Sequence, residues 1–325
     1  MSEKNSWHGK RVLVTGAGGF IGSHLTDALV SKGAEVSVFI KWDSGSGSRP
    51  QLIDNLQQSI GKIKNILKGD LASEDAIKTI KANSPEIIFH LAAEAYVNYS
   101  FDHPLEVLKA NLLGTLNVLH AAMDLKEVQQ VVCTSSSEVY GTAQKESIDE
   151  LHPLNPTSPY AASKVAADRY CYAYWKTYGL PVAIIRPFNT YGPRHTYDVI
   201  PKFIDLALRN EPLTIYGSGE QSRDFTYVSD MVEAFMLMGS RKEAIGQAVN
   251  FGNGRDYSVN FIAEKIRELS KSKSKIVHVE KRLAEVQRLI CDYGLAKKLF
   301  GWKPIVSIEE GLQRNIKWEK KQRGR

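Results

Sequence analysis

Short apolar runs alternate with longer amphipathic stretches along the first 186 residues of the chain. The runs are rich in Val and Ile, as is typical of buried parallel strands, and the stretches repeat apolar residues at the helical period. The predicted strands are Arg11–Thr15, Glu35–Ile40, Asn65–Lys68, Glu86–Leu91, Val128–Thr134 and Val182–Arg186. The predicted crossover helices are Gly19–Lys32, Ser73–Asn83, Pro104–Asp124 and Pro159–Tyr178.

This alternation predicts an α/β fold of the Rossmann type, a doubly wound parallel sheet with helices on both faces. After Arg186 turn residues cluster, and Leu213–Tyr216 and Ala248–Phe251 read as isolated strands. We therefore predict a Rossmann domain over residues 1–187, joined by parts of 224–255. A smaller α/β domain that binds the substrate is predicted mainly over residues 188–325. The low-complexity segment Ser44–Ser48 is expected to be a loop.

A glycine-rich turn follows the first predicted strand and precedes the first predicted helix. Its glycines permit a tight turn, close approach of the backbone to a pyrophosphate and close packing of helix on strand. A turn without a ligand is the alternative, but this place in a βαβ unit favours dinucleotide binding, and hence a dinucleotide-binding first domain. The residues expected at the cofactor here are Gly16, Gly19, Phe20, Ile21 and Gly22.

The end of the second strand bears on which dinucleotide binds. Ile40 and Lys41 stand where an NAD site usually offers an acidic residue to the ribose. Lys41 beside Ser44 and Ser46 can accept a 2′-phosphate, which slightly favours NADP, whereas Asp43 can reach a ribose hydroxyl instead, or Lys41 can be a solvated charge. Further cofactor contacts, or ordinary strand ends, are Asp70, Leu71, Leu91, Ala92 and Ala93.

Tyr160 and Lys164 are one helical turn apart in the predicted helix Pro159–Tyr178. A free tyrosine has a pKa near ~10, so it becomes a usable base at neutral pH only when a cation stabilises its phenolate. The Lys164 ammonium can do this and can also hold a cofactor ribose. The alternative is an amphipathic helix in which the two residues stand four apart by chance. The dinucleotide turn upstream makes this alternative less favoured.

Ser136, Ser137 and Glu138 follow the fifth predicted strand, at the carboxyl edge where open α/β sheets bind ligands. Ser136 is placed to hydrogen-bond an alcohol that is oxidised. Glu138 adds a carboxylate that can remove a proton from the carbon next to a new ketone, although a loop acid is the alternative.

Composition excludes several other classes. The chain has a net charge of +6, of which a C-terminal cluster of five basic residues less Glu319 supplies +4, so nucleic-acid binding is not expected. No run of about 18 apolar residues could span a membrane, and we expect a soluble cytoplasmic protein. The three scattered cysteines predict neither disulfides nor a metal site. The basic cluster comprises Lys317, Lys320, Lys321, Arg323 and Arg325.

These residues resemble the extended short-chain dehydrogenase/reductase family, in particular its nucleotide-sugar epimerase/dehydratase branch, and the likeness covers nearly the whole chain. Further shared motifs are Asn111-x-x-Gly114-Thr115, Arg186-Pro-Phe-Asn189-Thr-Tyr-Gly192-Pro-Arg194, Arg223-Asp-Phe-Thr-Tyr-Val-Ser-Asp230, and Arg288 ahead of Asp292.

Glu138 separates groups within the family. The resemblance implies a small apolar residue there in epimerases, and Glu in 4,6-dehydratases and uronate decarboxylases. Ser137 resembles the GDP-mannose and UDP-N-acetylglucosamine dehydratases, because dTDP-glucose dehydratases carry Asp there. The sequence around Tyr160 differs from the usual decarboxylase pattern. A 4,6-dehydratase acting on UDP-N-acetylglucosamine is therefore favoured over a 4-epimerase, a UDP-uronate decarboxylase or a non-catalytic nucleotide sensor.

The resemblance also implies how such an enzyme works. Tyr160 removes the O4 proton during C4 oxidation, Glu138 removes the C5 proton, water leaves from C6, and hydride returns to C6, so a tightly bound dinucleotide is regenerated. Ser137 is a weaker acid than Asp, which leaves the donor to the leaving hydroxyl open. The helices Pro104–Asp124 and Pro159–Tyr178 match those of a homodimeric four-helix bundle. The substrate contacts carried over are Glu94, Asn189, Arg194, Arg223 and Arg288.

Overall fold

The computed structural model describes residues 7–41, 54–280 and 286–324. The chain divides into two compact units. Unit 1 comprises Met1–Val139, Ser158–Arg186 and Val232–Val249, and unit 2 comprises Tyr140–Thr157, Pro187–Met231 and Asn250–Arg325. Whether these units act as the predicted functional domains, residues 1–187 and 188–325, stays a prediction. The loop predicted over Ser44–Ser48 lies outside the described residues.

A seven-stranded sheet forms the centre of unit 1, in the order β10-β6-β5-β4-β1-β2-β3. The pairs from β3 through β6 are all parallel, as buried apolar runs linked by crossover helices require. The predicted α/β fold is thereby confirmed. The strands are β1 (Arg11–Thr15), β2 (Glu35–Ile40), β3 (Asn65–Lys68), β4 (Ile87–His90), β5 (Gln130–Thr134), β6 (Val182–Pro187) and β10 (Ala248–Phe251).

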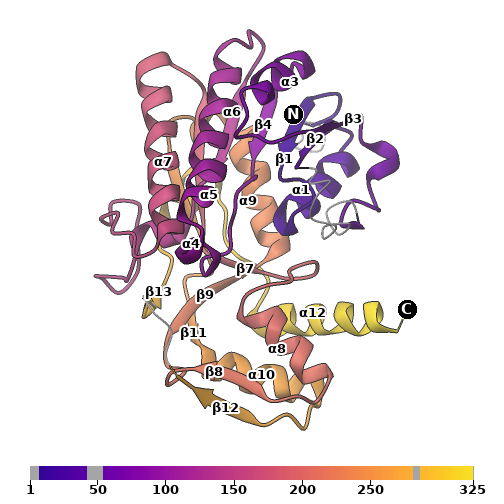
Figure 1. Cartoon of the computed structure of the whole chain (residues 1–325), viewed down its shortest axis with the longest axis vertical. Coiled ribbons are helices and arrows are strands. Elements are labelled where there is room, and N and C mark those ends of the chain that lie inside the picture. Colours follow the sequence, from indigo (N-terminus) through magenta and orange to yellow (C-terminus); the bar gives the residue numbers. More distant parts are fainter. Residues whose placement is uncertain (1–6, 42–53, 281–285, 325) are drawn as a thin grey trace. The chain divides into compact units, whose positions relative to one another are not determined.

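Helices pack on both faces of this sheet. The helices of this part of the chain are α1 (Phe20–Ser31), α3 (Asp75–Asn83), α4 (Tyr99–Asp102), α5 (Pro104–Leu108), α6 (Gly114–Met123), α7 (Pro159–Tyr178) and α9 (Val228–Ser240), with 3₁₀ turns at Ile60–Lys62, Ser137–Tyr140 and Lys242–Ala244. Figure 1 shows α3, α6 and α7 side by side in one layer. The helix predicted over Pro104–Asp124 is interrupted by a π-helical turn, Lys109–Leu113, between α5 and α6.

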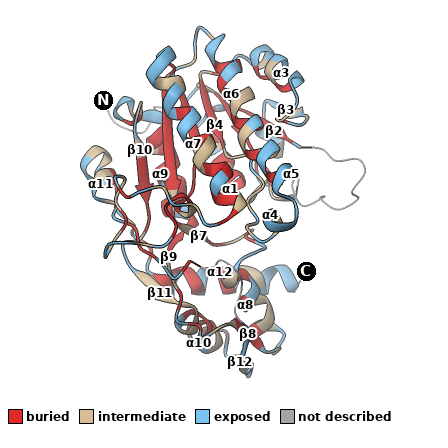
Figure 2. Cartoon of the chain, turned by 60° about the vertical axis from the view of Figure 1, so that its left-hand side comes forward, coloured by how far each residue is buried: buried red, intermediate tan, exposed pale blue. Residues whose placement is uncertain are grey.

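The core of unit 1 lies between the sheet and these helices. On one face, Leu13, Ile88 and Val131 share a buried cluster with Ile80 of α3 and Val118 of α6. On the other face, α1 packs on β1 and β2, and Gly239 of α9 approaches the Phe89 ring closely enough that a Cβ would lie 2.3 Å from it. Figure 2 shows the inner strands of this sheet, such as β4, as buried and the outer faces of the helices as exposed.

Unit 2 contains two smaller sheets and their helices. Its strands are β7 (Asn189–Tyr191), β8 (Leu213–Tyr216), β9 (Ser222–Tyr227), β11 (Asp256–Ser258), β12 (Ile276–Val279) and β13 (Arg288–Leu289). β9 pairs with β7, β11 and β13, and β8 pairs with β12. The helices α8 (Val199–Leu208), α10 (Val259–Ser270) and α12 (Ile308–Arg323) pack on one another, and α11 spans Gly294–Phe300.

Helix ends in both units follow from local sequence. The Ser158 hydroxyl accepts the Ala161 N–H at 3.1 Å at the start of α7, and Gly179 ends that helix at a positive φ of 68°. Ser258 and Ser307 cap α10 and α12 in the same way. Among the described residues, no helix has the length and apolar character needed to cross a membrane.

Candidate functional site

The glycine turn connects β1 to α1 as predicted. Gly16 has a φ of 69°, which favours glycine, and a Cβ there would lie 2.7 Å from the Ala92 nitrogen. A Cβ on Gly22 would lie 2.3 Å from the Gly16 carbonyl oxygen. Asn55, which sequence reasoning missed, donates to the Gly18 carbonyl at 2.9 Å. The turn is therefore tightly closed and needs glycine at both positions.

The turn leads directly into the first turn of α1, at Phe20 and Ile21. The first N–H groups of a helix have no acceptor within it and carry a partial positive charge, so a dinucleotide pyrophosphate fits there. The ends of β1 and β4 meet beside this turn, because Leu91 N–H donates to the Thr15 carbonyl at 3.2 Å and Ala92 N–H donates to the Thr15 hydroxyl at 3.2 Å. Ala93 follows as an exposed residue.

Lys41 and Asp70 come together past the ends of β2 and β3. Their Nζ and Oδ2 atoms are 2.9 Å apart, and both side chains are largely exposed. Partial burial would raise the pKa of Asp70, but the Ala72 N–H and Lys41 lower it on balance. Leu71 beside it is buried. Lys41 therefore already has a counter-ion, whereas Asp43, Ser44 and Ser46 lie outside the described residues.

Tyr160 and Lys164 lie in the first half of α7, and both are buried. The Lys164 ammonium donates to the Thr134 carbonyl at the end of β5. Burial lowers the pKa of Lys164 to about 8, against the opposing influence of Cys171, Cys133 and Asp168. This contact fixes the start of α7 to the carboxyl end of β5.

The hydroxyl cluster and Glu138 follow β5 directly. Ser136 and Ser137 are buried, and Glu138 is half-buried in a 3₁₀ turn. The Ser136 hydroxyl accepts the Glu138 N–H at 3.1 Å, so it orients the backbone of that turn. Thr134 and Ser135, which were not singled out, have buried hydroxyls with no hydrogen-bond partner among the described residues. Their position at the carboxyl end of a predicted strand is the sequence signal that could have identified these two residues.

Glu94 is held through its backbone. Asn111, in the π-helical turn, accepts the Glu94 N–H at 2.7 Å and donates to its carbonyl at 3.1 Å. The Asn111 amide also donates to the Ser163 hydroxyl of α7 at 2.9 Å. Asn111 therefore connects the segment after β4 to the helix that carries Tyr160.

The other four predicted substrate contacts belong to unit 2. Asn189, Arg223 and Arg288 lie on β7, β9 and β13, which pair as neighbouring strands. Arg223 donates to the carbonyls of Ser222 and Val286 at 2.9 and 2.7 Å. Arg288 Nε donates to Asp256 at 3.0 Å.

Two of these four residues have unusual local environments. The buried Asn189 Oδ1 has no hydrogen-bond partner among the described residues. Arg194 has a φ of 69° in the segment before α8, a strained conformation for a residue with a Cβ. Such strain is often retained at ligand-binding sites.

The three cysteines are buried and free. No group of three or more His, Cys, Asp or Glu residues in the described part of the chain could hold a metal ion. The chemistry available at the carboxyl edge of unit 1 is therefore that of a tyrosine, an ammonium group, serine hydroxyls and a carboxylate beside a dinucleotide turn.

Comparisons with known proteins agree with this chemistry. The family model described as GDP-mannose 4,6 dehydratase matches residues 13–315. UDP-glucuronic acid decarboxylase 1 of Xenopus tropicalis is 37% identical over 99% of this chain and 74% of its own length. A putative UDP-glucose 4-epimerase of Methanocaldococcus jannaschii is 33% identical over 95% of this chain and 98% of its own.

Solved structures show the same likeness. The dTDP-glucose 4,6-dehydratase of Streptomyces venezuelae, determined with NAD bound, superposes with a TM-score of 0.88 and 30% identity. The match covers 97% of this chain and 98% of that one. The chain therefore belongs to the GDP-mannose 4,6-dehydratase family, the nucleotide-sugar dehydratases, epimerases and decarboxylases of the short-chain dehydrogenase/reductase type.

Proposed function

We propose that this chain is a nucleotide-sugar 4,6-dehydratase. The observation that carries the proposal is the position of Glu138 in the 3₁₀ turn that directly follows β5. The Lys164 ammonium bonds to Thr134, the last residue of the same strand. Oxidation and reduction at C4 alone require Tyr160 and Lys164, whereas a carboxylate beside them adds a base for a second proton.

Tyr160 is the base for the C4 hydroxyl in this mechanism. The buried Lys164 ammonium lies one turn further along α7 and stabilises the phenolate, so that Tyr160 can accept the O4 proton near neutral pH. Ser136 is proposed to hydrogen-bond the same oxygen. Gly16, Gly19 and Gly22 would hold a nicotinamide dinucleotide, which would accept the hydride from C4 and later give it back.

Glu138 acts next. A ketone at C4 acidifies the C5 hydrogen, and the Glu138 carboxylate removes it. The hydroxyl at C6 then leaves as water, with the proton donated by Glu138 or by a water molecule that Ser137 holds. Loss of water leaves a C5–C6 double bond beside the C4 ketone. The hydride removed from C4 would be returned to C6 and a proton would add at C5, so the net change is loss of water to give a 4-keto-6-deoxy sugar.

UDP-N-acetylglucosamine is the proposed substrate, because Ser137 precedes Glu138 as in the dehydratases of that type. Arg194, Arg223 and Arg288 are proposed to bind its diphosphate, since the guanidinium fork can pair two phosphate oxygens. Asn189 offers a buried amide oxygen with no partner among the described residues, and Glu94 is proposed to contact the sugar.

Incubation with UDP-N-acetylglucosamine, GDP-mannose and dTDP-glucose, followed by mass spectrometry, tests the proposal. Loss of one water from a hexose product is expected. Glu138→Gln should reduce that product about 100- to 10,000-fold, while reduced nicotinamide still forms because C4 oxidation does not need the carboxylate. Glu146→Gln, at an exposed position, is the matched control. Full turnover by Glu138→Gln would remove this mechanism.

Two relatives define the alternatives to be excluded. The Xenopus decarboxylase supports trying a UDP-uronate, from which loss of carbon dioxide would indicate decarboxylation. The Methanocaldococcus relative supports testing for epimerisation, in which the mass is unchanged and the C4 configuration is inverted. Either result without loss of water would reject the dehydratase.

Lys41 is the residue proposed to favour NADP over NAD. Its pairing with Asp70 is exposed, so a 2′-phosphate can compete for the ammonium. Titration of both dinucleotides should show that Lys41→Met weakens NADP⁺ binding more than NAD⁺ binding. Equal weakening would assign Lys41 no part in this choice. Retention of the dinucleotide through gel filtration tests the proposed tight binding.

A homodimer is proposed through two helical segments, residues 104–123 (α5, the π-helical turn and α6) and α7, which would form a four-helix bundle with the same two segments of a second copy. These helices pack side by side in unit 1 and expose several large apolar side chains. Sedimentation should show a dimer that Leu105→Glu dissociates, whereas Leu151→Glu, an exposed leucine of unit 2, should not. The large hydrophobic side chains exposed on these helices are Leu105, Leu108, Leu113, Met123, Tyr170, Tyr172 and Tyr178.

A further inference from the structure

His90 ends β4 as a polar residue in an otherwise apolar strand, and only 3% of it is exposed. Its Nδ1 lies 2.8 Å from the Thr15 hydroxyl oxygen, and its Nε2 lies 3.0 Å from the Thr115 hydroxyl oxygen. Both threonines are buried. None of the chemical steps proposed above uses this ring, yet three elements of unit 1, β1, β4 and α6, meet at it.

The protonation of the ring follows from the direction of these bonds. The Thr115 hydroxyl donates its single proton to the Asn111 carbonyl at 2.6 Å, because a carbonyl can only accept. The Thr115 oxygen must therefore accept from His90, so Nε2 carries a proton. At the other end, the Thr15 oxygen accepts the Ala92 N–H, which leaves the Thr15 proton free to be donated to Nδ1.

The charge around the ring excludes the alternative in which both nitrogens are protonated. Burial, and then the positive charge of Lys164, lower the pKa of His90 to about 3. On β5 the register neighbour of His90 is Cys133. His90 is therefore a neutral imidazole that accepts from Thr15 and donates to Thr115.

The bonds continue beyond Thr115 to the helix that carries Tyr160. The Asn111 amide donates to the Ser163 hydroxyl at 2.9 Å, and Ser163 donates to the Tyr160 carbonyl at 2.7 Å. Thr15 immediately precedes Gly16, where the dinucleotide turn begins. One buried series of hydrogen bonds thus runs from that turn, through His90, to the backbone of Tyr160.

We propose that His90 is a positioning residue which, as the neutral Nε2–H tautomer, fixes the Tyr160 helix relative to the dinucleotide turn. The inference rests on the proposed role of Tyr160 and Lys164 in C4 oxidation. A neutral ring is required because an imidazolium would place a second positive charge near Lys164 and would turn two donors toward the threonines.

Nitrogen NMR of the protein labelled with ¹⁵N-histidine tests the tautomer without any substrate. His90 is assigned by the loss of its signals in His90→Gln. We expect a protonated Nε2, an unprotonated Nδ1 and no titration between about pH 5 and 8, since the ordinary histidine pKa is ~6.5. A protonated Nδ1, or titration near ~6.5, would overturn the inference even if the enzyme proved to be a dehydratase.

Kinetics test the positioning role. His90→Leu should lower kcat about 10- to 100-fold, with a smaller change in KM, because a misplaced Tyr160 impairs the reaction more than binding. His90→Gln should recover most of the loss, since its amide can accept from Thr15 and donate to Thr115. Equal activity of the Leu and Gln variants would contradict a role through these two bonds.

Substitutions of Thr115 test the proposal independently, and Thr26 provides a matched control. Thr115→Val should reproduce the kinetic defect, and Thr115→Ser should not. Thr26 of α1 forms the same kind of buried bond to the carbonyl four residues earlier, at 2.8 Å. Thr26→Val should leave the His90 tautomer unchanged, and a changed tautomer in that variant would attribute the effect to general loosening of unit 1.

Discussion

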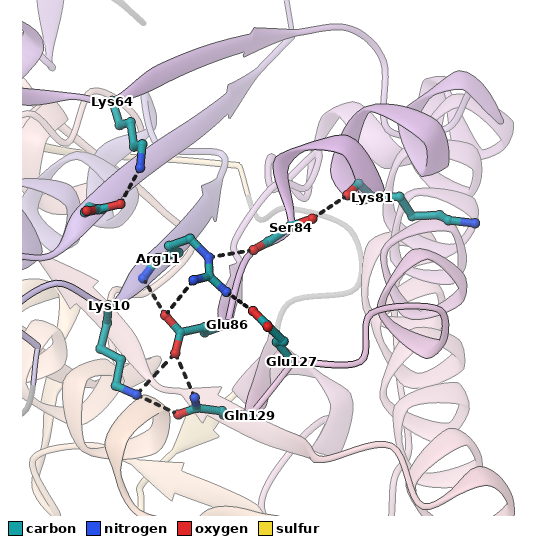
Figure 3. Close-up of polar contacts among 9 residues, drawn as sticks. Lys10, Arg11, Lys64, Lys81, Ser84, Glu86, Glu127 and Gln129 are labelled. Atoms are coloured by element: carbon teal, nitrogen blue, oxygen red, sulfur yellow. Dashed lines mark hydrogen bonds and ion pairs between the residues drawn. The ribbon is translucent and has the colours of Figure 1, made fainter.

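Polar residues line both the amino and the carboxyl edges of the large sheet in unit 1, but they are paired in different ways. At the amino edge, residues just before or at the start of β1, β4 and β5 form a closed set of contacts (Figure 3). Glu86 accepts the Arg11 N–H at 3.0 Å, the Lys10 ammonium at 3.3 Å and the Gln129 amide at 2.8 Å. Arg11 also bonds to the Ser84 carbonyl at 3.0 Å and pairs with Glu127.

At the carboxyl edge, polar groups are left incompletely paired. The hydroxyls of Thr134 and Ser135 are buried with no partner among the described residues, and Gly16 holds a positive φ. Lys164 bonds to a neutral carbonyl, and its burial lowers its pKa to about 8. At the amino edge, by contrast, the contacts of Glu86 with Arg11 and Lys10 outweigh burial and lower the pKa of that acid.

The difference indicates a division of roles within one sheet. Fully paired charges stabilise the folded state but have no spare capacity to bind a ligand. Incompletely paired groups cost stability and can be satisfied by a ligand, as expected where open α/β sheets bind their ligands. Substitutions should therefore separate the edges, with activity lost at one and stability lost at the other.

Tyr160→Phe should give the largest effect. Removing the phenol leaves no base for the C4 hydroxyl, so turnover should fall about 100- to 10,000-fold, with little change in melting temperature. Product formation by mass spectrometry and thermal unfolding are the two measurements. Tyr174→Phe, on the same helix, is the control and should retain full turnover. A large loss of stability in Tyr160→Phe would show that the carboxyl edge is structural too.

Lys164→Met should lose activity and gain stability. Burial of the ammonium lowers its pKa from 10.5 to about 8, so the charged group costs the folded state up to about 3 kcal/mol. The loss of the bond to the Thr134 carbonyl offsets part of this gain.

The pH dependence of that gain has a defined sign. Below pH 8 Lys164 is charged in both the folded and the unfolded state, so the gain in free energy of unfolding of Lys164→Met over the wild type has its full value. As pH rises from about 8 to 10.5, the folded state loses its proton first and the advantage shrinks. Urea unfolding of both proteins across this range measures it. An advantage that grows with pH would mean that the ammonium stabilises the fold.

Much of the fold could be predicted from the sequence, because its signals are local. β1 and α7 have the predicted bounds, since β1 is a buried apolar run and α7 begins at a Ser-Pro cap and ends at Gly179. The π-helical turn Lys109–Leu113 was not predicted, because the apolar spacing of Pro104–Asp124 fits one continuous helix. The apolar spacing does not reveal the one wider turn that makes this segment π-helical.

The candidate site divides in the same way. Tyr160 and Lys164 could be matched to each other because they lie four residues apart on one helix. The contact of Lys164 with Thr134, and those of His90 with Thr15 and Thr115, join residues distant in the chain. Such contacts depend on how β1, β4, β5, α6 and α7 pack, which a single sequence does not specify.

Glu86→Gln gives the smallest expected effect and tests the other edge. The Glu86 side chain is 14% exposed, and its oxygens accept bonds from Lys10, Arg11 and Gln129. Loss of the charge should lower the free energy of unfolding by about 1–3 kcal/mol at neutral pH. Turnover should not change, because the amino edge has no part in the proposed chemistry.

The dependence of stability on pH in acid and the matched variant Glu127→Gln make this last test specific. Because the folded-state pKa of Glu86 is lowered from 4.5, its contribution is present above that pH and is lost as pH falls through the lowered value. The difference between wild type and Glu86→Gln should therefore shrink in acid. Glu127 also pairs with Arg11, but its side chain is 73% exposed, so Glu127→Gln should cost at most about 1 kcal/mol. Equal losses of unfolding free energy in the two variants would mean that ion pairing stabilises this edge whether or not the acid is buried. The contrast between the two edges would then depend on the number of ion pairs.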